Sequence, residues 1–138
     1  MESVDANVLL RLTVGDIPEQ RDLARGLIGR PGSPLAASPV VLMEFVHALT
    51  SHYQATREQA AGALKDLLDL DNLHTDQETV AAALDWWVGH PKLSFEDCYV
   101  AAHAAATGAT PLWTFDKKLA RQHPAARELT EAALPPDG

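Results

Sequence analysis

The chain has one cysteine, Cys98, so it lacks the disulfide framework that staples small secreted domains. Its first residues carry no basic segment of a secretory signal, and no apolar run approaches the roughly 20 residues of a membrane span. Basic residues are also scarce, because 11 Lys and Arg stand against 19 Asp and Glu, for a formal net charge of −8. We therefore expect a cytoplasmic protein that does not bind nucleic acid through a broad basic surface.

Several well-defined catalytic motifs are missing as well. The sequence contains no H-E-x-x-H pair, no G-x-S-x-G elbow, no Walker A loop and no G-x-G-x-x-G turn. His47 and His52 are five residues apart, off the helix face that a zinc site needs. We expect the six histidines to be surface or partly buried residues.

Short apolar segments alternate with helical patterns along the 138 residues. This order predicts an α/β protein, a three-layer α/β/α sandwich around a small, mostly parallel central sheet. We expect a single domain over residues 1–133 and a flexible C-terminal tail over 134–138.

The stretch from Ser94 to Lys118 has the clearest pattern of a helix, a turn, a strand and a second helix. Ser94 is positioned to cap an alanine-rich helix, and Gly108 is positioned to end it. Residues 111–115 are apolar and rich in strand formers, which predicts a strand buried on both faces. A further helix should begin after Asp116.

Four acidic residues stand at positions where a ligand could be bound. Asp5 and Asp116 each follow a predicted strand, Asp97 lies in the first turn of a helix, and Glu44 interrupts the apolar half of a helix over 39–53. Each Asp alone is better explained as a helix cap or a first-turn acid than as a ligand. Glu44 could lie on a solvated stripe with His47, so neither acid type decides the function by itself.

Carboxylate ligands without Cys or His select Mg²⁺ or Mn²⁺. Such an ion lowers the pKa of bound water and neutralises a phosphodiester under attack. Ligands bind at the carboxyl ends of parallel strands, so we expect the four acids to converge in one pocket there.

The segments around these acids resemble PIN-domain ribonucleases, and most closely the VapC-like toxins of type II toxin–antitoxin systems. The segments that carry the resemblance are residues 5–10, 41–46, 95–102 and 114–119. The resemblance implies a PIN fold and a Mg²⁺-dependent endoribonuclease that hydrolyses RNA. The matching positions are Asp5, Glu44 and Asp97 as core acids, Asp116 as a more variable fourth, and Asn7 and Thr114 as supporting residues. Ala6 departs from the Thr or Ser usual there.

The resemblance also implies two protein partners, a cognate antitoxin that blocks the site and a second toxin chain. Trp86 and Trp87 are adjacent, so they cannot both face one core, and we expect one of them at a homodimer interface.

Two other classes of function remain open. Asp5 could be the nucleophile of a phosphatase or phosphotransfer protein, although Asn7 stands where such sites usually carry a second acid. Alternatively, the acids are only caps in a non-catalytic interaction module.

Overall fold

The computed structural model describes residues 1–134 and 136. The chain forms two compact units, Met1–Gln77 and Glu78–Gly138, and each is described by itself. The single domain expected over 1–133 stays a prediction. The expected tail over 134–138 falls mostly outside the described residues.

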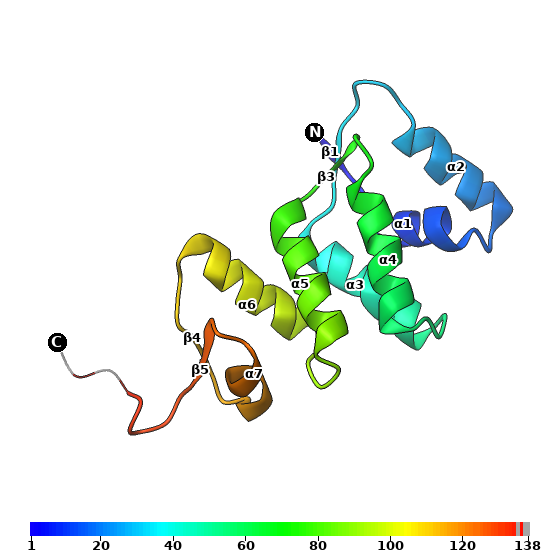
Figure 1. The fold of residues 1–138 in the computed structure, drawn as a ribbon. Coiled ribbons are helices and arrows are strands. Elements are labelled where there is room, and N and C mark those ends of the chain that lie inside the picture. Colours follow the sequence, from blue (N-terminus) through cyan, green and yellow to red (C-terminus); the bar gives the residue numbers. More distant parts are fainter. Residues whose placement is uncertain (135, 137–138) are drawn as a thin grey trace. The chain divides into compact units, whose positions relative to one another are not determined.

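The first unit is a small parallel sheet with helices. Its elements in chain order are β1 (Glu2–Ser3), α1 (Ala6–Val14), α2 (Pro18–Ile28), β2 (Leu35–Ala36), α3 (Pro39–Ser51), α4 (Arg57–Leu68) and β3 (Leu73–His74). The strands pair in the order β1-β2-β3, all parallel. Figure 1 labels the four helices α1 to α4 of this unit. Helix α1 packs against α2 and α3, and α3 packs against α4.

Local capping explains where the helices of the first unit begin. The Ser38 hydroxyl accepts a hydrogen bond from the Val41 N–H, and Pro39 occupies the first turn of α3. Thr56 and Gln59 form a reciprocal capping box at the start of α4. Gly15 ends α1 with φ +67°, a left-handed conformation that glycine adopts without strain. These ends follow from the sequence alone.

Large hydrophobic side chains fill the core of the first unit. Those that are almost completely buried are Leu9, Leu35, Leu42, Phe45, Leu64 and Leu73. They come from α1, α3, α4, β2 and β3, so the hydrophobic effect holds the helices against the sheet. Truncating one such Leu to Ala typically costs about 2–5 kcal/mol.

The second unit contains α5 (Gln77–Gly89), whose first residue belongs to the first unit, and α6 (Phe95–Thr107). They are followed by β4 (Leu112–Thr114), α7 (Lys117–Gln122) and β5 (Ala126–Glu128). Strands β4 and β5 pair in parallel, with Trp113 opposite Arg127. The sequence did not predict β5. The expectation that residues 111–115 are buried on both faces is wrong, because β4 is half-buried and Phe115 is 77% exposed.

The two adjacent tryptophans of α5 have different surroundings within the second unit. Trp87 is buried and meets the Phe95 ring edge-on. Trp86 is half-buried, with its ring stacked on His90 and tilted against His123. Two histidines therefore cover the tryptophan that we expected to need a second chain.

The prediction of an α/β protein with small parallel sheets is confirmed. Helices dominate the described residues, and every strand pair is parallel. Within residues 1–134 and 136, no helix is long and apolar enough to cross a membrane.

Candidate active site

Asp5 follows β1 and is the N-cap of α1. Its Oδ1 accepts a hydrogen bond from the Val8 N–H at 3.1 Å, and the side chain is exposed. The interpretation of Asp5 as a cap is therefore correct. The cap uses one carboxylate oxygen, so it leaves Oδ2 for a ligand.

Asp5 and Asn7 line a groove of about 310 Å³ along α1 and α2. Its other lining residues are Val8, Arg11, Gln20, Leu23, Ala24 and Leu27. Leu23 is 74% exposed, so part of the apolar lining faces solvent. The groove thus joins an acidic end to an apolar wall.

Arg11 is held by polar partners at this groove. Its Nε donates to Gln20 Oε1 at 2.8 Å, and its Nη1 donates to Asp16 Oδ1 and to the Tyr53 hydroxyl. The Tyr53 hydroxyl in turn donates to Asp16 Oδ2 at 3.0 Å. The hydrogen bond with Tyr53 and the charge of Asp16 raise the pKa of Arg11. Arg11 is therefore a fixed cation at every pH at which the protein folds.

Glu44 lies on the exposed stripe of α3, together with His47 and Ser51. The Ser51 hydroxyl donates to the His47 carbonyl oxygen, so this stripe is satisfied by its own helix. The residue after Glu44, Phe45, belongs to the core. Helix α3 thus buries its apolar face and presents the Glu44 carboxylate to solvent.

Asp97 is half-buried in the first turn of α6. The cap of this helix is the Ser94 hydroxyl, which accepts a hydrogen bond from the Asp97 N–H at 3.1 Å. The cap therefore uses the backbone of Asp97 and the side chain of Ser94. It does not use the Asp97 carboxylate, which distinguishes Asp97 from Asp5.

Asp116 follows β4 and is the N-cap of α7. Its Oδ1 accepts from the Lys118 and Leu119 N–H groups, at 2.9 and 3.2 Å. The Thr114 hydroxyl accepts a hydrogen bond from the Asp116 N–H at 2.9 Å. Thr114 thus orients the backbone of Asp116 from one side while the helix holds its carboxylate from the other.

The four acids are divided equally between the two units. Asp5 and Glu44 belong to the first, and Asp97 and Asp116 belong to the second. Glu44 does not line the groove that contains Asp5. Within the described residues of either unit, no three His, Cys, Asp or Glu side chains gather closely enough to hold a metal ion. Convergence of all four acids stays a prediction.

The donor set nevertheless fits a hard divalent cation. Carboxylate, amide and hydroxyl oxygens are the ligands of Mg²⁺ and Mn²⁺, whereas zinc prefers thiolate and imidazole. Neither Asp5 nor Asp116 commits both carboxylate oxygens to its cap.

Sequence reasoning missed the burial of His123, which is only 7% exposed. Its Nδ1 accepts a hydrogen bond from the Ala125 N–H at 3.1 Å, so in the neutral ring the proton lies on Nε2. Burial lowers the pKa of His123, and repulsion from His90 lowers it further. The spacing of Trp86 and His90, four residues apart on α5, is the one signal that could have indicated this ring cluster.

The family model for the PIN domain matches residues 3–123, which is most of the chain. This chain belongs to the PIN domain family. PIN domains are generally nucleases that use divalent metals, so the family supports a hydrolase that acts on nucleic acid. The search of curated proteins found no match. The PIN family match includes Asp5, Glu44, Asp97 and Asp116 within its span.

Proposed function

We propose that this PIN domain is a Mg²⁺-dependent endoribonuclease that acts in the cytoplasm as the toxin of a VapC-like toxin–antitoxin pair. The observation that supports nuclease activity is the position of the acidic residues at strand ends and helix starts. Asp5 and Asp116 both follow a strand, both cap a helix through Oδ1, and both keep a second oxygen for a ligand. Strand ends followed by helices are where α/β proteins bind ligands.

The metal would be held by Asp5, Glu44, Asp97 and Asp116, with Mn²⁺ as an alternative ion. A bound Mg²⁺ supplies an activated water and neutralises the charge of the phosphodiester. Thr114 contributes by holding the Asp116 backbone through its hydroxyl. Asn7 offers an amide at the groove that Asp5 lines, where it can donate to a phosphate oxygen. Grouped carboxylates repel each other, so binding of the ion should stabilise the fold.

A non-catalytic interaction module is the second candidate, because the caps at Asp5 and Asp116 give both acids a structural role. Such a module would bind no metal through these side chains. An aspartate-based phosphatase has less support, since the exposed residue two after Asp5 is an amide, Asn7.

The antitoxin is proposed to cover the groove along α1 and α2. A segment with apolar side chains would bury Leu23 and Leu27 there, and it would reach the end of the groove that Asp5 lines. Pairing of two toxin chains rests on the family resemblance alone, because His90 and His123 already cover Trp86.

Cleavage of a mixed RNA pool by the purified full chain tests the nuclease. We expect cleavage with Mg²⁺ or Mn²⁺ and none with excess chelator. Asp97→Asn should lose more than about 100-fold in rate, since even outer-shell partners of a metal are worth 10–100-fold. Glu96→Gln is the matched control, because Glu96 is an exposed acid in the same helical turn. Equal rates for the two variants would refute the assignment of Asp97.

A further inference from the structure

Phe115 is the one aromatic side chain that the described chain leaves largely exposed, at 77%. It lies between β4 and α7, directly before Asp116. Burying an aromatic ring is worth more than burying most side chains, so the exposed Phe115 ring offers a large contact to a binding partner. The other Phe, Tyr and Trp rings of the chain are buried or half-buried.

The residues around Phe115 are basic, although the chain has a net charge of −8. Four of its 11 Lys and Arg fall between residues 113 and 127, namely Lys117, Lys118, Arg121 and Arg127, against Asp116 as the one acid. All four are exposed, and none forms an ion pair with the residues that the structure describes. Their charge is thus available to an anionic partner.

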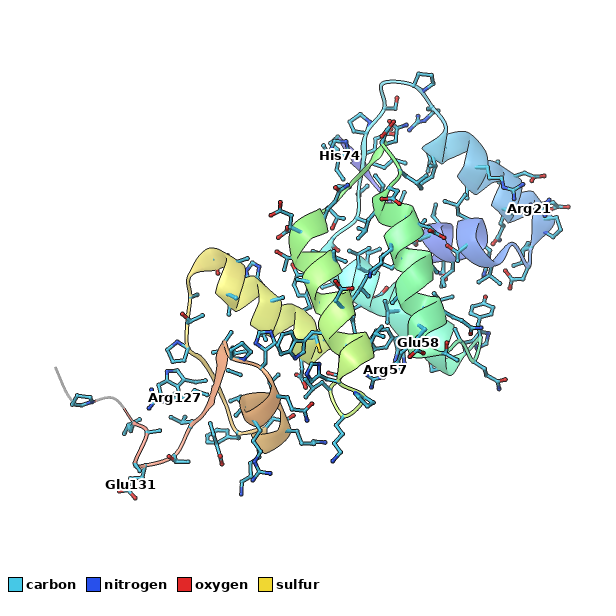
Figure 2. The ribbon with its side chains drawn as sticks, viewed as in Figure 1. Arg21, Arg57, Glu58, His74, Arg127 and Glu131 are labelled. Atoms are coloured by element: carbon cyan, nitrogen blue, oxygen red, sulfur yellow. The ribbon has the colours of Figure 1, made fainter. Side chains whose placement is uncertain are left out.

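A second aromatic side chain lies on the same strand. Trp113 is half-buried, and the Arg127 guanidinium lies over its ring, 5.5 Å from the centroid. Arg127 comes from β5, where it pairs with Trp113 and carries its side chain away from the strand (Figure 2). Phe115 directly follows β4, in a bend of the chain before α7. We call Trp113, Phe115, Lys117, Lys118 and Arg127 the β4–α7 patch.

We propose that the β4–α7 patch binds single-stranded RNA, with Phe115 stacked on an unpaired base and the cations on the adjacent phosphates. Aromatic rings beside cations are how proteins hold single strands, because every base has a face that stacks. A duplex keeps its bases stacked on each other, so it cannot use the Phe115 ring. This inference rests on the proposed ribonuclease function and adds which residues hold the strand next to Asp116.

Binding, measured apart from cleavage, tests the patch. The probe is a fluorescein-labelled single-stranded RNA of about 12 nucleotides, within the usual range of site sizes, titrated by anisotropy with full-length Asp97→Asn in chelator. In that background, Phe115→Ala should weaken binding about tenfold or more, because a stacked base is worth that much. Phe115→Trp should bind at least as tightly as the parent. Val100→Ala, at an exposed apolar residue of α6, is the matched control and should bind unchanged.

The salt dependence of binding distinguishes the cations of the patch from its aromatic ring. Lys117→Ala should weaken binding of single-stranded RNA and also reduce the slope of log affinity against log salt, by about 0.7 for one lost phosphate contact. Phe115→Ala should leave this slope unchanged, because stacking releases no counterions. The Phe115 ring is mostly in water, so a thermal melt should find all variants folded.

Several outcomes would overturn the inference. They are equal affinity of Phe115→Ala and its parent for the single strand, an equal loss for a duplex of the same sequence, or failure of Phe115→Trp to restore binding. If Phe115 matters for binding but the unsubstituted chain does not cleave RNA with Mg²⁺ or Mn²⁺, the proposed nuclease fails and the RNA-binding patch stands. If the parent cleaves RNA and Phe115→Ala binds normally, the patch fails alone.

Discussion

Each unit has an aspartate that caps a helix, but the two aspartates are held by different numbers of hydrogen bonds. Each places an Asp after a strand as the cap of the next helix, Asp5 in the first unit and Asp116 in the second. The Asp5 carboxylate receives one backbone N–H, whereas Asp116 receives two and has its own N–H held by Thr114. The more variable acid of the family resemblance is therefore the better anchored one in this chain. Its anchoring makes Asp116 the more rigid of the two capping acids.

The polar interactions of the two units also differ in kind. The first unit joins Arg11, Asp16 and Tyr53 by charge-assisted hydrogen bonds near the surface. The second unit stacks Trp86 between His90 and the neutral His123. Protonation of a histidine changes the second arrangement, whereas the first arrangement contains no histidine. We therefore expect the ring cluster of the second unit to respond to pH through His123.

The largest expected effect removes the ring between the two histidines. Trp86→Ala should lower the free energy of unfolding by about 3 kcal/mol, because a large ring is replaced by a void. Trp86→Phe should cost much less, since the buried indole Nε1 has no hydrogen-bond partner among the described residues. Urea unfolding of both variants measures the difference. Equal losses would mean that the indole N–H, and not the ring, stabilises the cluster.

Substitution of Thr114 tests whether its hydrogen bond with the Asp116 N–H positions Asp116. Thr114→Val keeps the shape of the side chain and removes the oxygen that accepts the Asp116 N–H. RNA cleavage should fall about tenfold, as for other residues that orient metal ligands, while Thr114→Ser should retain it. A full rate for Thr114→Val would show that the cap alone positions Asp116.

Substitution of Ser94 distinguishes the effect of the helix cap on stability from the effect of the Asp97 carboxylate on cleavage. Ser94→Ala removes the acceptor for the Asp97 N–H and should destabilise the fold by about 1 kcal/mol. Cleavage below the melting transition should change little, because the Asp97 carboxylate remains. A rate loss as large as that of Asp97→Asn would instead indicate that the cap controls the acid.

The smallest effect concerns pH. The pKa of His123 is lower in the folded chain than in the unfolded one, so the unfolded state binds more protons below about pH 6.5. Stability from this group is complete above that pH and is lost as the pH falls toward the lowered pKa. His123→Asn can keep an acceptor for the Ala125 N–H and should show a shallower loss between pH 7 and 5 in urea unfolding. Identical slopes would exclude His123 as the cause.

Local features of the fold were predictable from sequence, and long-range ones were not. The sequence predicted the caps at Asp5, Ser38, Thr56 and Asp116, because a cap depends on three or four neighbouring residues. Strand β5 was missed because three residues without alternation become a strand only by pairing with β4.

The same distinction applies to the candidate site. The identity and order of the four acids came from the sequence, and the structure adds which oxygens the caps use. The cover of Trp86 by His123 depends on tertiary contact, and so does any meeting of acids from the two units. The exposure of Phe115 was also unpredicted, because an apolar residue after a strand favours burial.

The central proposal is that acids of both units hold Mg²⁺, and metal-linked stability tests it most directly. Thermal melts with and without Mg²⁺ would compare the parent with Asp5→Asn from the first unit and Asp97→Asn from the second. The exposed first-turn acids Glu58 and Glu96 provide matched controls as Glu58→Gln and Glu96→Gln (Figure 2 labels Glu58). We predict that Mg²⁺ raises the melting temperature of the parent and both controls. The two Asn variants should be more stable than the parent without metal and should lose the Mg²⁺ response. A parental Mg²⁺ response in either Asn variant would contradict a shared metal site.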